Sequence, residues 1–321
     1  MIITPEELKK KIDTLTVIDV RPKNQQVNFP LVGLNSIKSE NGAIPKVKGT
    51  NVLICQFGIV TEGIIIEKKL KNTLSLLGGA QAWNHFNNEK KDFSRWSHQT
   101  VLPELGIEGQ NKLFNSKITI VGMGGLGCPA AQSLLTIGVG NLNLIDGDII
   151  ALSNLHRQPL YGPNDVGLKK VIVAKKKLTS LNYDSKINIT DTNLDDKNGM
   201  SLLSESDVII DATDNIASRV LIDKLSKNTN IPMIYGGLYR WEGQVSVLNV
   251  NGSPGYTELF PNPKPGGETC EDAGILGMIS GIIGNIQALE AVKLIVGVKN
   301  NLVGKLLIYD GMNHTTQIID L

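Results

Sequence analysis

Apolar residues occur in short runs along the chain, and their arrangement changes near residue 90. Before that point, two short apolar runs at 15–20 and 51–57 predict strands. A helix-like stretch and the segment 74–83 follow them, which is typical of a small α/β domain. The charged stretch 88–95 predicts a connection between domains. We therefore expect a first α/β domain over residues 1–90.

From Lys117 onward, strand-like runs and helical periodicity alternate regularly. Strands are expected at 117–121, 141–146, 206–213 and 231–237, with a helix from Gly125 to about Ile137 after the first of them. This alternation predicts a doubly wound sheet. Two further strand-like segments, 242–250 and 304–320, lie on either side of the apolar helical stretch 281–297 and predict antiparallel strands. The expected fold is a Rossmann-like doubly wound mixed sheet over 117–321, preceded by a linker and helical segment at 91–116.

Composition restricts the kind of partner. The 321 residues carry a formal net charge of +1 and contain no long run of one sign, so we expect neither nucleic acid nor an anionic membrane as the main partner. No uninterrupted apolar segment approaches the roughly 18 residues that cross a bilayer, and the N-terminus is acidic and helical rather than signal-like. The three cysteines cannot all pair and are widely scattered. A cytoplasmic location is the expectation.

A glycine-rich turn, "VGMGGLG", connects the first strand of the second region to its helix. Gly122 ends the strand and Gly127 opens the helix, which is the context that a nucleotide-binding turn requires. Backbone N–H groups at such a helix start can face phosphate. Asp146 ends the next strand, where an acidic side chain typically binds a ribose hydroxyl. By themselves these features favour NAD, and the glycines could also serve only close packing of strand and helix.

The residues after Asp146 change this interpretation towards a triphosphate. The stretch "IDGDIIALSNLHRQ" brings polar groups to the edge of the nucleotide site, namely Ser153, Asn154, Arg157 and Gln158. Lys169 and Lys170 add cations at a helix start, and Asp214 in "DATDN" is a hard oxygen ligand suited to Mg²⁺. No G-x-x-x-x-G-K-[ST] motif is present, so ATP would bind without a P-loop. Taken singly, the cations could be solvated surface groups and Asp214 could cap the next helix.

Residues from about 92 to 321 resemble the MoeB/ThiF/HesA family of ubiquitin-activating-type adenylyltransferases. The motifs that carry the resemblance are "VGMGGLG", "DGDIIALSNLHRQ", "DVGLKK", "DATDN", "WEGQVSV" and "GIIGNIQALEAVKLIVG". The resemblance implies a homodimer that binds ATP and Mg²⁺. It implies adenylation of the C-terminal glycine of a small ubiquitin-like sulfur-carrier protein that ends in Gly-Gly, before the carrier is thiolated.

The resemblance also implies roles for individual residues. Gly125 contacts the phosphates, and Asp214 binds Mg²⁺. Asn154, Arg157 and Lys170 hold the phosphate chain, with Arg157, Lys170 and Asp214 acting in catalysis. The complete set expected to bind the nucleotide is Gly122, Gly124, Gly125, Asp146, Ser153, Asn154, Leu155, His156, Arg157, Lys170, Asp214, Asn215 and His98.

His98 departs from the family pattern. The segment "DFSRWSHQTVLPELG" matches an opening Arg-Tyr-x-Arg-Gln segment, with His98 in place of the second arginine. In the family that arginine reaches across the dimer to the distal phosphates of ATP. Arginine stays charged at any working pH, whereas histidine is mostly neutral at pH 7, so a weaker contact is expected.

The first region resembles a rhodanese-like sulfurtransferase domain. The resemblance rests on "VIDVRP", "VLICQFG" and "LLGGAQAW", and it places Cys55 at the position of a persulfide-forming cysteine. A cysteine at a strand end, within a turn of N–H groups, can have a lowered pKa. However, the loop from Cys55 to Gly63 contains no cation. Active sulfur chemistry, with a cysteine desulfurase as a candidate donor, and a degenerate domain that docks a partner both remain open.

Two further features concern cysteine. The family's structural zinc requires two Cys-x-x-Cys pairs, which are missing here, so a zinc-free fold is expected. Cys270 lies in the long Gly/Pro-rich segment 251–274 and matches the cysteine of the family's crossover loop, which takes part in sulfur transfer or a covalent link to the carrier in some members. The alternative is a bystander thiol on a surface loop.

Three functional hypotheses therefore remain. The first is an ATP-dependent adenylyltransferase for a sulfur carrier. The second is adenylation of another acceptor, as in a dehydratase-type relative, against which the near-neutral charge counts. The third is a non-catalytic scaffold that binds partners. Which carrier is used, for molybdopterin, thiamin or another product, is left open by the sequence.

Overall fold

The computed structural model describes residues 2–39, 43–87, 93–261 and 274–321. The chain divides into two compact units, Met1–Phe93 and Ser94–Leu321. Residues 94–116, which the sequence separates from the sheet as a linker and helical segment, belong to the second unit. Each unit is described by itself.

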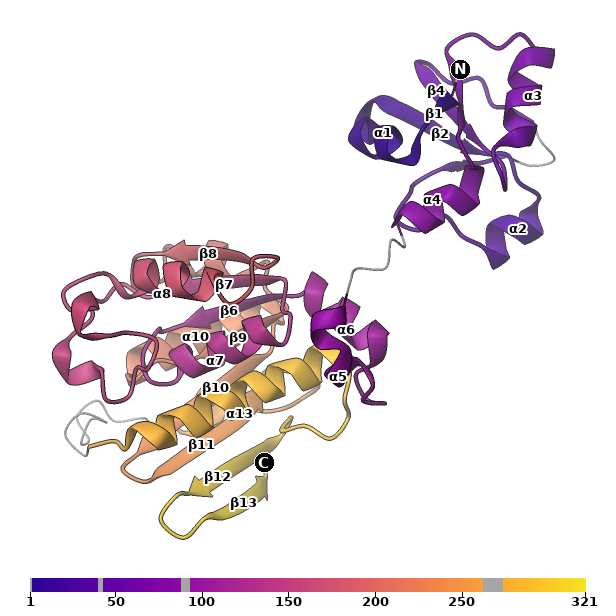
Figure 1. Cartoon of the computed structure of the whole chain (residues 1–321). Coiled ribbons are helices and arrows are strands. Elements are labelled where there is room, and N and C mark those ends of the chain that lie inside the picture. The colour runs from indigo at the N-terminus through magenta and orange to yellow at the C-terminus, as the bar shows by residue number, and fades with distance from the viewer. Residues whose placement is uncertain (1, 40–42, 88–92, 262–273) are drawn as a thin grey trace. The chain divides into compact units, whose positions relative to one another are not determined.

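The first unit is an α/β domain built on a parallel sheet (Figure 1). Its strands, in the order β1-β5-β4-β2-β3, are β1 (Ile2–Ile3), β5 (Thr73–Leu76), β4 (Thr50–Ile54), β2 (Leu15–Asp19) and β3 (Ile37–Lys38). Its helices are α1 (Pro5–Lys10), α2 (Lys23–Asn28), α3 (Ile59–Glu67) and α4 (Gly79–Asn87), with a 3-10 turn at Ile12–Thr14.

Local sequence explains how these elements begin and pack. Thr4 caps α1, because its hydroxyl accepts the N–H of Glu7 while the Glu7 carboxylate accepts the N–H of Thr4. Alternate residues of the central strands point to opposite faces, so Val52 packs in one apolar cluster and Leu53 in another. Cys55 follows β4 directly, at the carboxyl edge of the sheet.

The second unit contains a mixed sheet of eight strands in the order β13-β12-β11-β10-β9-β6-β7-β8. The five parallel strands are β6 (Lys117–Val121), β7 (Asn141–Ile145), β8 (Lys186–Thr190), β9 (Val208–Asp211) and β10 (Met233–Tyr239). The antiparallel extension consists of β11 (Glu242–Leu248), β12 (Lys305–Asp310) and β13 (Thr315–Asp320). This arrangement confirms the expected doubly wound mixed sheet.

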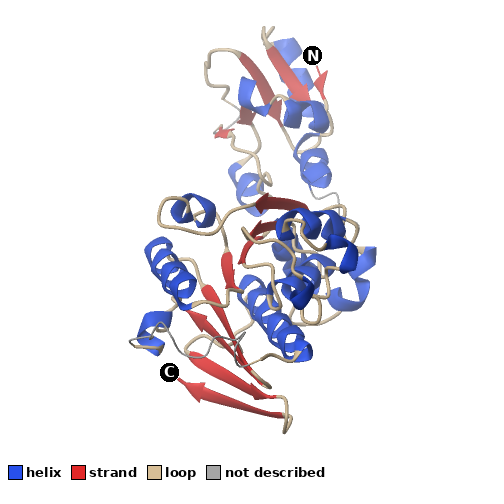
Figure 2. Cartoon of the chain, turned by 90° about the vertical axis from the view of Figure 1, so that its left-hand side faces the viewer, coloured by secondary structure: helices blue, strands red, loops and turns tan. Residues whose placement is uncertain are grey.

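Helices cover both faces of this sheet (Figure 2). They are α5 (Ser97–Thr100), α6 (Gly106–Asn115), α7 (Gly127–Thr136), α8 (Lys170–Thr179), α9 (Gly199–Leu203), α10 (Ile216–Thr229), α11 (Tyr256–Leu259) and α13 (Gly277–Val296). Short 3-10 turns lie at Ser94–Trp96, Leu152–Asn154 and Pro163–Asp165.

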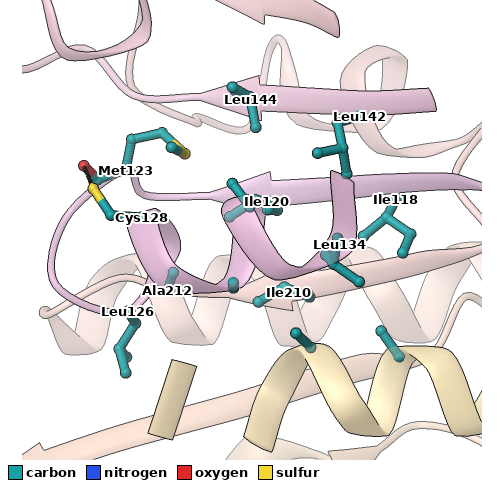
Figure 3. Close-up of a cluster of buried hydrophobic side chains, with 14 of the residues drawn as sticks. Ile118, Ile120, Met123, Leu126, Cys128, Leu134, Leu142, Leu144, Ile210 and Ala212 are labelled. Atoms are coloured by element: carbon teal, nitrogen blue, oxygen red, sulfur yellow. Dashed lines mark hydrogen bonds between the residues drawn. The ribbon is translucent and has the colours of Figure 1, made fainter. Parts of the chain in front are cut away.

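The alternation of strand residues sorts the core into two layers. Ile118 and Ile120 of β6 pack in the layer that α7, α8 and α13 cover, and Figure 3 shows them beside Leu134 of α7. Val121 packs on the opposite face, in the layer that includes Ile222 of α10. Burial of these faces provides the main driving force for folding, at about 25 cal/mol per Å² of apolar surface.

α13 is the long apolar helix expected from the sequence. By length and composition this 20-residue helix could cross a membrane, but 56% of its apolar window is buried inside the unit. It packs against α6, α7, β10 and β11 (Figure 1). Its apolar character is therefore explained by its place in the core.

Candidate functional site

A cavity of about 510 Å³ lies beside the carboxyl ends of β6, β7 and β9. This is the edge of an open α/β sheet at which ligands bind. The cavity is lined by residues of the glycine turn and of the polar stretches that follow β7 and β9. Those used below are Gly122, Gly124, Gly125, Asp146, Asp148, Asn154, Arg157, Gln158, Lys170, Asp214, Asn215, Arg219 and Ser280.

The glycine turn brings backbone close to backbone at the start of α7. Gly122 has a φ of +97°, and a Cβ there would lie 2.6 Å from the carbonyl oxygen of Ala212. A Cβ on Gly127 would collide with the carbonyl oxygen of Gly122. These two positions require glycine so that the turn can pass the end of β9 and open the helix beside the cavity.

Asp146 holds this turn from the end of β7. Its Oδ2 accepts the N–H of Met123 at 2.7 Å, and its Oδ1 accepts the N–H of Asp148 at 2.8 Å. Burial raises the pKa of the Asp146 carboxyl, while the charge of Lys170 and the two backbone N–H groups act in the opposite direction. The carboxylate therefore lies fixed and largely desolvated at the cavity wall.

Lys170 is a buried cation of the site. It is the first residue of α8, and 9% of its side chain is exposed. Its Nζ lies 2.8 Å from Asp148 Oδ2 and 3.9 Å from Asp146 Oδ2. The neighbouring Lys169 does not line the cavity, since its Nζ donates to the Gly147 carbonyl at 2.9 Å and lies 3.1 Å from Asp191 Oδ1. The structure thus distinguishes two adjacent lysines that the sequence placed together.

The segment after β7 supplies the other polar groups. Asn154 Oδ1 accepts the N–H of Ala151 at 3.1 Å, which closes the 3-10 turn. Arg157 Nη1 donates to the Ser153 carbonyl at 3.1 Å, so the arginine is held by its own turn at the cavity. Gln158 is 2% exposed, and its Oε1 has no hydrogen-bond partner among the described residues.

Asp214 lies in the loop that follows β9 and is exposed. Asn215, and not Asp214, caps α10, because Asn215 Oδ1 accepts the N–H of Ser218 at 2.9 Å. The alternative that Asp214 serves as the helix cap is therefore wrong. The Asp214 carboxylate faces the same cavity as the two cations, within reach of a ligand.

The donor set fits an anionic nucleotide. The lining includes the cations Arg157, Lys170 and Arg219. It also includes the glycine turn that opens a helix, whose N–H groups can face phosphate, and a carboxylate placed for a hydroxyl, Asp146. Buried polar atoms without partners among the described residues lie in the same lining, namely Gln158 Oε1 and Ser280 Oγ. Such atoms are rare in native proteins unless a ligand or water satisfies them.

The model of the ThiF family matches residues 96–321, which is more than half of the chain. The chain belongs to the ThiF family. This confirms the expected family for the second unit. The family match does not extend over the first unit.

Curated relatives carry names from the same family. The chain is 41% identical over 225 residues to a "Probable molybdopterin-synthase adenylyltransferase" of Porphyra purpurea, covering 69% of this chain and 59% of that protein. It is 39% identical over 226 residues to "Adenylyltransferase and sulfurtransferase MOCS3" of Dictyostelium discoideum, covering 69% of this chain and 53% of that protein. These matches span between half and three fifths of the relatives' length.

Solved structures share the fold. The structure of E. coli MccB with MccA-N7isoASN has a TM-score of 0.63 at 21% identity, with 74% of this chain and 73% of that chain covered. A structure of E. coli MccB with ATP has a TM-score of 0.57 at 22% identity, covering 66% of each chain. At this identity the likeness concerns the fold alone.

Not every residue expected at the nucleotide lines the cavity of this ThiF-family chain. Leu155 packs against the core, and His156 is exposed. Ser153 contributes its carbonyl to Arg157 but does not line the cavity. His98 is exposed on α5 and also lies outside the lining.

Several lining residues were missed by sequence reasoning, among them Asp148, Arg219 and Ser280. Asp148 pairs with Lys170, and Arg219 of α10 lies beneath the loop that carries Asp214. Asp148 lies within the motif after β7, but no sequence pattern indicates that it pairs with Lys170. Arg219 could have been found as a cation in the first turn of a helix, where the dipole disfavours positive charge.

Cys55 of the first unit lies in a tight polar loop. Its Sγ accepts the N–H of Gly58 at 3.1 Å and lies 3.5 Å from Thr61 Oγ1. Burial would raise the pKa of the Cys55 thiol, but hydrogen bonds from Thr61 and from backbone N–H groups of the loop hold it below its ordinary value. The nearby Arg21 is committed to Asp19, with a distance of 2.7 Å from Nη2 to Oδ2.

The other two thiols differ from Cys55. Cys128 is buried in the α7 layer beside Met123 (Figure 3), and burial raises its pKa to about 12. Cys270 lies outside the described residues, as does half of the expected crossover loop. Within the described ranges no group of three His, Cys, Asp or Glu side chains could hold a metal ion.

Proposed function

We propose that this chain binds ATP and Mg²⁺ and adenylates the C-terminal glycine of a small ubiquitin-like sulfur-carrier protein ending in Gly-Gly. The observation that carries the proposal is the single cavity lined by the glycine turn, Asp146, Arg157, Lys170 and Asp214. The names of the curated relatives support it.

The residues that line the cavity define how ATP would be bound. The N–H groups at the start of α7, near Gly125, would face the phosphates, and Asp146 would bind a ribose hydroxyl. Arg157 and Lys170 would neutralise the phosphate chain, and Asn154 would add a hydrogen bond to it. The structure of MccB with ATP supports a nucleotide in this fold.

The chemistry is a displacement at phosphorus. A carboxylate oxygen of the carrier attacks the α-phosphorus of ATP, a new C–O–P linkage forms, and the bond from that phosphorus to the bridging oxygen breaks to release pyrophosphate. The nucleophile is already ionised at pH 7, so no general base is required. Two anions must be brought together, and Arg157 and Lys170 lower the barrier by neutralising the phosphate charge.

Asp214 would hold the Mg²⁺ ion. A carboxylate oxygen is a preferred ligand of this hard cation, which keeps several waters and is bound together with substrate phosphates. When bound, the ion would supply further neutralisation of phosphate charge. A single protein carboxylate at the cavity is therefore sufficient on the protein side.

The expected assembly is a homodimer. In a homodimer the partner copy would bring the opening segment, with His98, towards the phosphates. His98 is exposed in its own unit, which leaves it accessible to a second copy.

For the first unit we propose a rhodanese-like domain that supplies sulfur to the activated carrier. The lowered pKa of Cys55 supports a reactive thiol. With no cation from Cys55 to Gly63, a persulfide from a cysteine desulfurase suits the site better than an anionic donor such as thiosulfate. Cys270 would then engage the activated carrier, and no structural zinc would be required.

Pyrophosphate exchange tests this proposal. Asp214→Ala is expected to abolish incorporation of labelled pyrophosphate into ATP in the presence of Mg²⁺ and the carrier. Asp196→Ala, which removes an exposed carboxylate paired with Lys224, is the matched control and should exchange normally. Undiminished exchange by Asp214→Ala would remove this residue from the proposed mechanism.

A further inference from the structure

Arg219 occupies an unusual position beside the cavity. It lies in the first turn of α10, where its N–H donates to the Asn215 carbonyl at 3.3 Å. The positive end of the helix dipole disfavours a cation at this position by about 0.3–1 kcal/mol. Its side chain is also only 12% exposed. A buried cation in such a place requires a compensating role.

Charge compensation by Asp211 is incomplete. The carboxylate of Asp211 is fully buried, and its Oδ2 lies 3.9 Å from Arg219 Nε, beyond hydrogen-bond distance. Both atoms have no hydrogen-bond partner among the described residues. The guanidinium instead lies over the ring of Tyr235, 5.3 Å from its centroid. The distance between Arg219 and Asp211 is therefore longer than in an ion pair that is also hydrogen-bonded.

Two of the contacts that Arg219 makes join the loop after β9 to β10. Its Nη2 donates to the Thr213 carbonyl at 3.0 Å and to the Gly236 carbonyl of β10 at 3.4 Å. From the other side, Asp211 Oδ1 accepts the Thr213 N–H at 3.0 Å and the Thr213 hydroxyl at 2.6 Å. Thr213 is thus held at its N–H, its side chain and its carbonyl.

The next residue, Asp214, has no comparable support. Its carboxylate is exposed, and the described contact to it is a long one, 3.5 Å from Asn215 Nδ2 to Oδ1. The direction in which Asp214 leaves the backbone is therefore set by the peptide plane between Thr213 and Asp214. Arg219 fixes that plane by binding its carbonyl oxygen.

We propose that Arg219 is a positioning residue for Mg²⁺, which orients the Asp214 carboxylate towards the cavity by clamping the Thr213 carbonyl to β10. The inference rests on the proposed function, because it assigns Asp214 to the metal. Residues that orient a metal ligand without contacting the metal typically contribute 10- to 100-fold to metal affinity. The lower end is expected here, since Asp211 still holds the N–H and hydroxyl of Thr213.

The test is calorimetric titration of ATP into the full chain at increasing Mg²⁺ concentration, with EDTA as the metal-free arm. Arg219→Gln is expected to raise the half-saturating Mg²⁺ concentration about tenfold. It should leave metal-free ATP affinity within about twofold of wild type, since the guanidinium does not itself hold phosphate. Lys224→Gln removes an exposed cation, paired with Asp196, from the same helix and should behave as wild type.

A double variant separates positioning from charge compensation. Asp211→Asn with Arg219→Gln removes both charges and leaves no unpaired buried ion, so it also tests the idea if Arg219→Gln alone fails to fold. The half-saturating Mg²⁺ concentration should stay raised about tenfold in the double variant. Return to the wild-type value would show that Arg219 serves only to balance Asp211, and would overturn the proposal.

Two further outcomes would also contradict it. Weaker metal-free ATP binding in Arg219→Gln would mean that the guanidinium contacts phosphate directly. An unchanged Mg²⁺ dependence with a lower unfolding temperature would mean a purely structural role. If the wild type bound no ATP, the proposed function would fail together with this inference. If the wild type bound ATP with Mg²⁺ and Arg219→Gln bound it with the same Mg²⁺ dependence, the inference alone would fail.

Discussion

Replacing Lys170 by glutamine is expected to reduce adenylation strongly, whereas the same change at Lys169 is not. Both lysines stand at the start of α8, but only Lys170 lines the cavity. Lys169 is tied to the Gly147 carbonyl and to Asp191 on the outer side. The pair therefore provides a variant and a control that differ by one position in the chain.

The size of the effect follows from how Lys170 is held. Loss of one preorganised donor that stabilises developing charge typically costs about 10²–10³ in kcat. Lys170 already shares its charge with Asp148 at 2.8 Å and with Asp146 at 3.9 Å, so its interaction with phosphate is partly offset. We therefore expect the lower end, a loss of about 10²-fold, or about 2.7 kcal/mol.

Stability should change less than activity. Asp148 is 62% exposed, and ion pairs at the surface contribute about 0–1 kcal/mol. Asp146 is buried beside Lys170, but it keeps its two backbone N–H bonds after the change, so its carboxylate stays partly compensated. Because Lys170 is itself buried, Lys170→Gln is expected to lower the free energy of unfolding by about 1–2 kcal/mol.

Pyrophosphate exchange and urea denaturation measure the two quantities on the same preparations. The reasoning would be refuted if Lys170→Gln retained activity within threefold of wild type. It would equally fail if Lys169→Gln lost as much activity as Lys170→Gln.

Three other predictions follow from backbone geometry, thiol environment and the expected dimer. Gly122→Ala should lower the free energy of unfolding of the second unit by at least about 1–2 kcal/mol in chemical denaturation, because φ at Gly122 is +97°. Gly281→Ala places its Cβ in open space and should leave the stability unchanged. Equal stability of the two variants would contradict this prediction. Cys55 should be alkylated at lower pH than an ordinary thiol because its pKa is lowered, and Cys128, with a pKa near 12, should stay unmodified until the protein unfolds. Peptide mapping over a pH series measures both, and modification of Cys128 before Cys55 would contradict this reasoning. His98→Arg should raise the rate of adenylation and flatten its dependence on pH, since arginine keeps its charge, and an unchanged rate and profile would argue against a contact across the dimer.

Much of the fold could be predicted because most helices and strands have a local sequence pattern that indicates them. Strand β6 is a run of apolar residues that ends at Gly122, and α7 begins at Gly127 as the glycine spacing requires. The segment 304–320 was expected to be strand, and the structure divides it into β12 and the exposed β13. Element boundaries shifted by a few residues: α13 begins at Gly277, four residues before the start expected from the sequence.

The site was predictable only in part, because motifs name residues but not their contacts. The residues after Gly122 and Asp146 converge on the cavity because parallel strands end at one edge. The resemblance assigned the phosphate chain to Lys170 alone, whereas the contacts that hold Lys170 and Lys169 differently are seen only in the structure. Arg219 was missed for a related reason, since its contacts join β9, α10 and β10, which are distant in the sequence.

The central claim is tested most directly by the dependence of exchange on the carrier's last residue. The full chain would be incubated with Mg²⁺, ATP, labelled pyrophosphate and a small ubiquitin-like carrier that ends in Gly-Gly. We predict that label enters ATP with the intact carrier and not with the same carrier lacking its terminal glycine, because the attacking carboxylate must reach the α-phosphorus. Equal exchange with the truncated carrier, or exchange without any carrier, would contradict adenylation of that glycine.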